Sequence, residues 1–159
     1  MKKYDLFIAG GGMGGSAAAK FAARGGLETL FVERCKTPRT KPCSGIQFEY
    51  FERILDETIP RDRLCNHQVT RTSMYYHDGT SFSAPFTAFN YMRKTFDNWL
   101  NILAQEAGAE FRDECAYVDH EEDSDGFVVT IQSRGGDPEK IRARDGSSWW
   151  EMPRACSTA

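Results

Sequence analysis

The chain has 159 residues, of which 40% are hydrophobic and 27% charged, with a formal net charge of -3 at pH 7. This composition is ordinary for a globular protein and sufficient for one modest core. Because the sequence has no basic block, electrostatics argue against nucleic acid and against an anionic membrane surface as partners. No signal peptide or membrane span precedes the first predicted strand, so we expect no transmembrane segment and a cytoplasmic location.

A short apolar run at Asp5–Ala9 predicts a buried strand, and a glycine-rich turn and an alanine-rich helix from about Met13 to Arg24 follow it. This order is typical of a cradle for dinucleotide phosphates. Gly10 permits the tight turn, Gly12 lets the backbone approach a pyrophosphate, and Gly15 allows close packing of helix and strand. The amides and positive dipole at the start of the helix then face the phosphates.

A second strand is predicted over Leu27–Val32, and it ends in Glu33. An acid about 20 residues beyond the glycines has the spacing needed to accept hydrogen bonds from an adenosine ribose. The alternative for Glu33 is a solvated charge at a strand end. With the glycine motif upstream, we favour ribose binding.

The middle of the chain contains an irregular, basic loop over Arg34–Gly45 with two prolines. Helical spacing of apolar residues then predicts a helix over Ile46–Glu57, whose aromatic stripe we assign to the core. Val69–His77 and Thr80–Phe86 are rich in strand formers and flank an Asp-Gly turn, which predicts an antiparallel hairpin insertion over residues 67–86.

A strong amphipathic helix is predicted to begin near Arg93 and to end at Gly108. A short strand over Ala109–Arg112 should rejoin the parallel sheet. Three further segments predict a β meander, namely Tyr117–His120, Gly126–Gln132 and Lys140–Arg144. The expected fold is α/β, with a parallel Rossmann-type sheet, the meander on one side and the hairpin insertion, as in an incomplete FAD/NAD(P)-binding domain.

The five cysteines are scattered and form no Cys-x-x-Cys pair, so we expect free thiols and no zinc site. The three histidines are isolated in polar surroundings, and surface or hairpin positions explain them better than catalysis; they are His67, His77 and His120.

Three separated blocks together resemble the N-terminal part of the geranylgeranyl reductase family of FAD-dependent oxidoreductases, which are relatives of flavin monooxygenases and flavin-dependent halogenases. The first is the glycine cradle with Glu33. The second is the loop Arg39–Gly45, whose Lys-Pro-Cys-Ser-Gly sequence is the most specific of the three. The third is Met92–Leu100 with Ala107–Glu110.

The resemblance implies site residues by position. Those expected to border the FAD pyrophosphate and the adenosine are Gly10, Gly12, Met13, Gly14, Glu33 and Arg34. Arg93 is expected beside the cofactor; its alternative is an ordinary helix N-terminal charge, which the dipole disfavours. The resemblance places the loop with Cys43 and Ser44 near the isoalloxazine. A direct chemical role for Cys43 ranks below the alternative of a small buried hydrophobe.

The implied function is that of a flavin-dependent oxidoreductase that passes hydride or electrons to or from an apolar small molecule. A polyprenyl chain is one candidate substrate and NAD(P)H a candidate reductant. Three alternatives stay open: a flavin monooxygenase or halogenase, an NAD-binding dehydrogenase domain, and a non-catalytic fragment that binds FAD weakly or not at all. No metal is expected.

Family members are more than twice as long as this chain, and their later half supplies a second FAD motif and most of the substrate cavity. We therefore divide the sequence into an N-terminal FAD-binding portion, residues 1–145, and an aberrant tail, residues 146–159. Read in another frame, the codons for the tail can spell a sequence close to the family's Asp-Ala-(Ser/Thr)-Gly turn, which suggests a frameshift. A divergent C-terminus or a chance codon match is the alternative.

Overall fold

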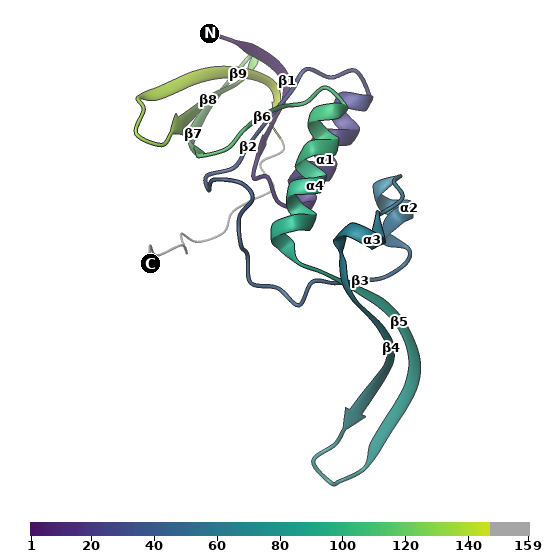
Figure 1. Cartoon of the computed structure of the whole chain (residues 1–159). Helices are drawn as coiled ribbons and strands as arrows, with labels where there is room; N and C mark the ends of the chain where they lie inside the picture. The colour runs from purple at the N-terminus through teal and green to yellow at the C-terminus, as the bar shows by residue number, and fades with distance from the viewer. Residues whose placement is uncertain (147–159) are drawn as a thin grey trace. The chain divides into compact units, whose positions relative to one another are not determined.

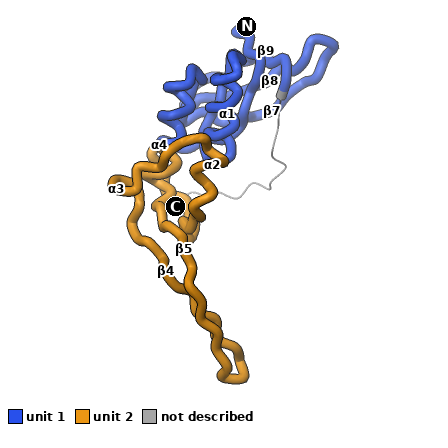
Figure 2. The backbone as a smooth tube through the Cα atoms, turned by 90° about the vertical axis from the view of Figure 1, so that its right-hand side faces the viewer, with its two compact units in different colours: residues 1–37, 99–159 blue, residues 38–98 orange. Residues whose placement is uncertain are grey.

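The computed structural model describes residues 1–146 of the chain. The polypeptide forms two compact units, which Figure 2 colours separately. The first contains residues 1–37 and the chain from residue 99 onward, and the second contains residues 38–98. Except for Gly146, the tail that we expect to be aberrant lies outside the described residues.

The first unit is built on a six-stranded sheet with the order β6-β2-β1-β9-β8-β7 (Figure 1). Its strands are β1 Lys3–Ala9, β2 Thr29–Val32, β6 Glu110–Arg112, β7 Cys115–Asp123, β8 Gly126–Ser133 and β9 Pro138–Gly146. The neighbours of β1 and β2 all run parallel, whereas β7, β8 and β9 pair antiparallel. The α/β prediction is confirmed. The meander continues the same sheet, because β9 pairs with β1.

Two helices in this unit end as their glycines predict. The helix α1 spans Met13–Arg24 and is followed by Gly26 in the left-handed region, with a φ of 84°. The helix α4 spans Arg93–Glu106 and is followed by Gly108, with a φ of 105°. Residues 99–106 of α4 belong to the first unit and lie beside α1 (Figure 1).

Apolar side chains alternate between the two faces of the sheet, as the pleat of a strand requires. Phe7 and Val32 belong to a cluster with residues of the meander, while the adjacent Ile8 and Phe31 belong to a second cluster. The second cluster includes Ala19 of α1 and residues 104 and 109. The sheet is therefore buried on both faces, which fits the nearly continuous apolar sequences of β1 and β2.

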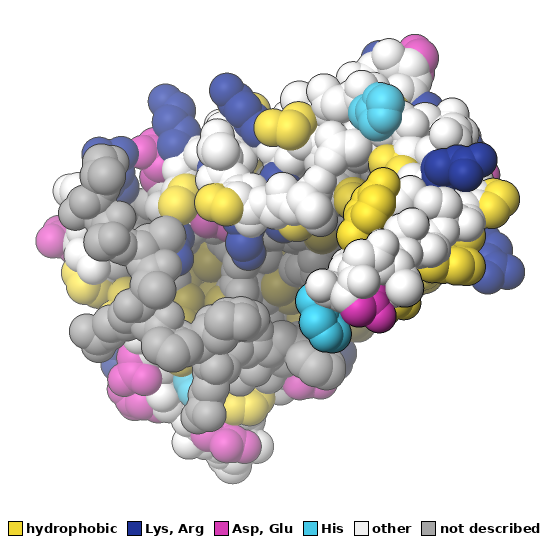
Figure 3. All heavy atoms as spheres, turned by 90° about the horizontal axis from the view of Figure 1, so that it is seen from below, with side chains coloured by type: hydrophobic (Ala, Val, Ile, Leu, Met, Phe, Trp, Pro, Cys, Tyr) yellow, Lys and Arg dark blue, Asp and Glu magenta, His cyan; other side chains and the backbone are white. Residues whose placement is uncertain are grey.

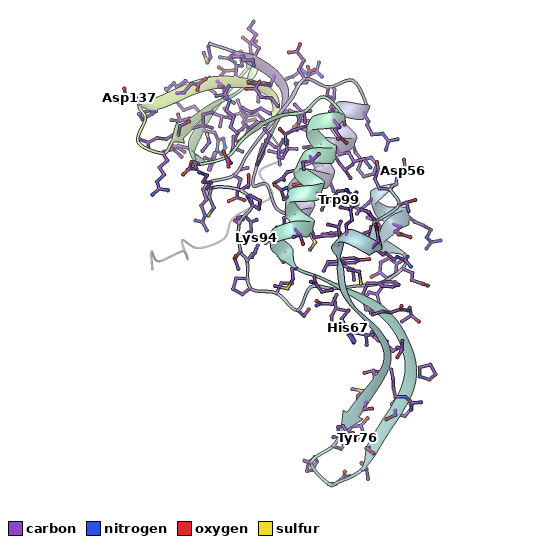
Figure 4. The ribbon with its side chains drawn as sticks, in the orientation of Figure 1. Asp56, His67, Tyr76, Lys94, Trp99 and Asp137 are labelled. Atoms are coloured by element: carbon purple, nitrogen blue, oxygen red, sulfur yellow. The ribbon has the colours of Figure 1, made fainter. Side chains whose placement is uncertain are left out.

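The second unit contains a long antiparallel hairpin. Its elements are β3 Ile46–Gln47, α2 Phe51–Leu55, α3 Arg61–Leu64, β4 Cys65–Tyr75, β5 Ser81–Tyr91 and the start of α4. In Figure 4, Tyr76 lies at the tip of the hairpin and His67 on β4. Met74 and Phe82 face each other across the strands and are 55% and 54% exposed. Hydrophobic side chains at the surface are visible between polar ones in Figure 3.

Aromatic rings fill the base of the second unit. Tyr91 and Phe96 stack with their centroids 4.9 Å apart, and Phe51 packs on Phe96 at 6.1 Å. The guanidinium of Arg61 lies 4.1 Å from the ring centre of Phe89, a cation–π contact. This aromatic cluster joins the end of β5 to the first turn of α4.

The prediction of one helix over Ile46–Glu57 is wrong. Its first residues form β3, where Ile46 lies opposite Asn90 of β5, and only the five residues of α2 are helical. Asp56, labelled in Figure 4, follows the end of α2. Its backbone is in the left-handed region, with a φ of 50°. The aromatic stripe is also not all core, since Phe48 and Ile54 are 40% and 55% exposed. Pairing with a distant strand overrode the helical spacing.

Cys35, Cys43, Cys65 and Cys115 are free thiols. Each histidine is exposed, with His67 on β4, His77 at the hairpin turn and His120 on β7. Within residues 1–146, no helix combines the length and the apolar character that crossing a bilayer requires.

Candidate functional site

The glycine-rich loop joins β1 to α1 in the first unit. Gly10 has a φ of 121°, and its N–H donates to the carbonyl of Val32 at 2.8 Å. A Cβ on Gly15 would lie 1.9 Å from the carbonyl oxygen of Gly10, so this position requires glycine. The close packing that the sequence suggested for Gly15 is therefore present. Gly15 packs against the backbone of the glycine-rich loop, at Gly10.

The first turn of α1 has features suited to an anion. Gly12 is the N-cap residue and provides no side-chain cap, and no acidic residue lies in the first turn. The first N–H groups of any helix lack acceptors within it. A Cβ on Gly14 would meet nothing within 4 Å, so the backbone there faces open space. These observations fit a pyrophosphate at this helix end.

Glu33 lies at the end of β2 and is 6% exposed. Its two carboxylate oxygens accept hydrogen bonds from the N–H groups of Gly11 at 3.2 Å and Cys35 at 3.0 Å. A carboxylate has about four acceptor positions, so one carboxylate can accept from backbone N–H groups and from hydroxyl donors together. The side chain is therefore not the solvated charge of the alternative interpretation; it is buried and tied to the glycine loop.

Gly11 is a residue that sequence reasoning missed. A Cβ at this position would lie 3.0 Å from the Cβ of Glu33 and 3.1 Å from Cε2 of Phe111. Its N–H also donates to Glu33. The glycine thus lets the loop lie directly on the end of β2. Arg34, the next residue after Glu33, is exposed and lines a shallow hollow of about 320 Å³ with residues of β7 and β8.

The loop with Cys43 belongs to the second unit and is fastened to the end of β5. The N–H of Tyr91 donates to the carbonyl of Gly45 at 2.9 Å, and the amide of Asn90 donates to the carbonyl of Ser44. Gly45 has a φ of 69°, and a Cβ on it would lie 2.3 Å from the carbonyl oxygen of Tyr91. The glycine that closes the Lys-Pro-Cys-Ser-Gly sequence is thus required by both conformation and space.

The thiol of Cys43 is exposed, contrary to the expectation of a buried hydrophobe. The N–H of Gly45 donates to its sulfur at 3.4 Å. This hydrogen bond has the largest effect on the thiol, and a hydrogen bond from Arg93 has the next largest. Together they lower the pKa of the Cys43 thiol below its ordinary value of 9.0. Stabilisation of the thiolate makes a thiol more nucleophilic at neutral pH.

Arg93 is the first residue of α4 and is held by Asp97, one turn later. Nε and Nη2 of Arg93 donate to the two carboxylate oxygens of Asp97 at 2.7 and 2.9 Å. This two-pronged contact raises the pKa of the Arg93 guanidinium. Sequence reasoning missed Asp97, although its i,i+4 spacing from Arg93 is a readable signal for an ion pair on a helix.

The predicted site residues thus fall into two groups. The first unit contains Gly10, Gly12, Met13, Gly14, Glu33 and Arg34, and the second contains Cys43, Ser44 and Arg93. Within the first group the glycine loop and Glu33 are in direct contact. Within the second, a hydrogen bond from Arg93 is one of the causes that lower the pKa of the Cys43 thiol. Among residues 1–146 there is no cluster of three or more His, Cys, Asp or Glu side chains able to hold a metal ion.

Comparison with known proteins gave no match to a family model. Digeranylgeranylglycerophospholipid reductase 2 from Methanopyrus kandleri is 32% identical over 145 residues, which cover 89% of this chain and 36% of the relative. FixC from Escherichia coli O157:H7 is 32% identical over 144 residues, which cover 83% of this chain and 33% of FixC. The chain spans about a third of the length of these curated relatives.

Solved structures share the fold. A geranylgeranyl bacteriochlorophyll reductase-like protein from Thermoplasma acidophilum superposes with a TM-score of 0.83 at 22% identity, covering 92% of this chain and 38% of that one. The myxobacterial chondrochloren halogenase, an FAD-dependent halogenase, gives a TM-score of 0.75 at 23% identity, covering 92% of this chain and 37% of the halogenase. At these identities the likeness shows the fold.

Proposed function

We propose that this chain binds the adenosine diphosphate half of FAD. The chain corresponds to the N-terminal portion of geranylgeranyl reductase-like and FixC FAD-dependent oxidoreductases. The observation that carries the proposal is the contact of Glu33 with the glycine loop. It joins the acid at the end of β2 to the loop that opens α1, which is the arrangement that recognises ribose and pyrophosphate together.

In this proposal the backbone of Gly10, Gly12, Met13 and Gly14 borders the pyrophosphate. Glu33 accepts hydrogen bonds from the ribose, and the exposed Arg34 lies along the adenosine. The open space beside Gly14 supports the first assignment, and the position of the Glu33 carboxylate against the glycine loop supports the second.

We assign Ser44 and Arg93 to cofactor binding, and to Cys43 a weaker role beside the flavin ring. The exposed thiol and the fixed guanidinium support this assignment. When bound, a flavin supplies hydride or single-electron transfer, and protein groups position and tune it.

The reaction proposed for the whole protein is flavin-mediated reduction or oxidation of an apolar small molecule, with NAD(P)H as the candidate reductant. A polyprenyl chain is the candidate substrate because the Methanopyrus relative is named for a digeranylgeranyl phospholipid. This activity is assigned to the protein that contains this portion, since the chain matches about a third of that relative.

Halogenation or monooxygenation is the alternative chemistry, because an FAD-dependent halogenase shares the fold. A non-catalytic fragment with little affinity for FAD is the alternative from another class, and NAD binding by the glycine loop is a third. Direct binding measurements separate the non-catalytic fragment and the NAD-binding interpretation from the proposal before any substrate is known.

The first experiment is calorimetric titration of the 159-residue chain with FAD, ADP, FMN and NAD⁺. We expect FAD and ADP to bind and FMN to bind weakly, because the contacts proposed for the first unit are to the adenosine half. Binding of none of them would support the non-catalytic fragment, and tighter binding of NAD⁺ than of FAD would support the dehydrogenase interpretation.

Two variants test the cradle. Gly14→Leu fills the open space beside the backbone and should abolish FAD binding while preserving the fold. Gly136→Leu is the matched control: it lies in the turn between β8 and β9, where a Cβ meets its nearest neighbour at 3.6 Å. An unchanged affinity of Gly14→Leu for FAD would show that the pyrophosphate does not bind at this end of α1.

A further inference from the structure

One carboxylate in the second unit is shared by two arginines. Asp97 receives the two-pronged contact from Arg93, and Nη2 of Arg39 lies 3.5 Å from its Oδ2. All three side chains are largely buried, with 3% of Asp97, 10% of Arg93 and 12% of Arg39 exposed. Few alternative geometries are open to such a group, because a buried guanidinium requires its partner.

Arg39 comes from the loop that contains Cys43, and Arg93 and Asp97 come from the first two turns of α4. Arg39 lies four residues before Cys43, and Arg93 opens α4. Backbone and side-chain hydrogen bonds from Tyr91 and Asn90 to Gly45 and Ser44 hold the Cys43 loop against the end of β5, two residues before Arg93. Arg93 is one of the two hydrogen-bond donors that lower the pKa of the Cys43 thiol. A cation at a helix N-terminus is opposed by the helix dipole. The carboxylate of Asp97 supplies the opposite charge that makes this position of Arg93 favourable.

We propose that Asp97 is a positioning residue, which fixes the Arg93 guanidinium toward the Cys43 thiol and anchors the Arg39 end of the same loop. This deepens the proposed function, on which its relevance to the flavin rests. Asp97 acts through Arg93, because it is 3% exposed and its two oxygens are occupied by guanidinium groups. A lysine in place of Arg93 would keep the charge but lose the planar fork that fixes the direction of the contact.

A positioning role and a purely electrostatic role of Asp97 predict opposite changes in the pKa of the Cys43 thiol when Asp97 is removed. If Asp97 acted only as a nearby negative charge, its removal would lower the pKa of the Cys43 thiol. If Asp97 holds Arg93 in place, its removal frees the guanidinium, the thiolate loses a donor and the pKa rises. The N–H of Gly45, which also donates to the sulfur, is the same in both cases.

The experiment measures alkylation of Cys43 by iodoacetamide between pH 6 and 10 in the full 159-residue chain, resolved by peptide mass spectrometry. We expect Asp97→Asn to move the midpoint of the rate profile upward by about one pH unit. Arg93→Lys should move it in the same direction. Glu52→Gln is the control, since Glu52 pairs with Arg61 at 3.0 Å in the same unit and should leave the midpoint unchanged.

A lowered or unchanged midpoint in folded Asp97→Asn would overturn the proposal. If that variant does not fold, Arg93→Lys decides alone, because it leaves the Asp97 carboxylate with a cation; an unchanged midpoint there overturns the proposal too. Thiol titration needs no cofactor, so it is independent of the proposed function. Absence of FAD binding by the unmodified chain, with the expected shifts present, would refute FAD binding and leave the role of Asp97 toward Arg93 standing.

Discussion

Asn101 of α4 and Ser16 of α1 form a buried hydrogen bond between the two helices of the first unit, with 2.5 Å between Oγ of Ser16 and Oδ1 of Asn101. The Ser16 hydroxyl also lies 2.9 Å from the carbonyl oxygen of Gly12. One hydroxyl proton cannot serve both acceptors, and Nδ2 of Asn101 has no partner among the described residues. An amide turned so that Nδ2 donates to Ser16 satisfies both contacts, since hydrogen-bond networks fix amide orientation.

This contact predicts a measurable coupling between α1 and α4. Asn101→Ala should lower the free energy of unfolding by about 1 kcal/mol, because it removes the hydrogen bond between the helices while the Ser16 hydroxyl keeps the carbonyl of Gly12. A double-mutant cycle with Ser16→Ala should give a coupling energy of about 1 kcal/mol or more, measured by urea denaturation. Strictly additive effects would mean that the two side chains do not interact in solution.

The neighbouring glycines of α1 should respond in opposite ways to alanine. Gly15→Ala places a Cβ against the carbonyl of Gly10 and should cost about 3 kcal/mol or more, as strained core substitutions do. Gly14→Ala enters open space and should be neutral or stabilise the helix by up to about 1 kcal/mol. Urea denaturation of both variants checks this, and equal effects would contradict the close approach at Gly15.

The elements that could be predicted from the sequence are those with strong local signals. The apolar run of β1, the glycines that end α1 and α4 and the three strands of the meander are each encoded within a few residues. The helix over Ile46–Glu57 failed because a two-residue pairing with β5 outweighed helical spacing. Such a pairing joins residues more than 40 positions apart, and no pattern within a short segment of the sequence predicts it.

The site divides in the same way. The glycine motif and Glu33 have a fixed spacing and were readable. The contacts of Gly11 with Glu33 and of Ser16 with Asn101 join residues 22 and 85 positions apart, so only the folded chain reveals them. Asp97 is intermediate, because its helical spacing from Arg93 was visible but its contact with Arg39 was not.

Glu110 should give the first unit an acid-dependent stability. Burial alone would raise the pKa of Glu110, but hydrogen bonds from Lys2, Tyr4 and Arg112 lower it to about 2 from its ordinary value of 4.5. A carboxyl whose pKa is lower in the folded state stabilises the fold above the unfolded value, and this contribution is lost as the pH falls from about 4.5 toward 2.

Glu110→Gln should therefore lower the free energy of unfolding near pH 6 by about 1 kcal/mol, allowing for solvent screening of a partly exposed group. It should also flatten the decline in stability between pH 5 and 3. Urea denaturation across this range provides the measurement. Glu106→Gln, at an exposed position on α4, is the control and should keep the original slope; an unchanged slope in Glu110→Gln would refute the assignment.

The cysteines should differ sharply in reactivity. Cys43 is exposed, and the N–H of Gly45 lowers the pKa of its thiol. Cys115 is fully buried between β-strands, and burial raises the pKa of its thiol. At pH 7.5 only unfolding exposes Cys115, so Cys43 should be alkylated roughly 10³-fold faster or more. Pulsed alkylation with peptide mapping measures both rates, which should converge in denaturant. Similar rates in the native chain would mean that Cys115 is accessible and that the β7 edge of the core opens far more readily than its packing implies.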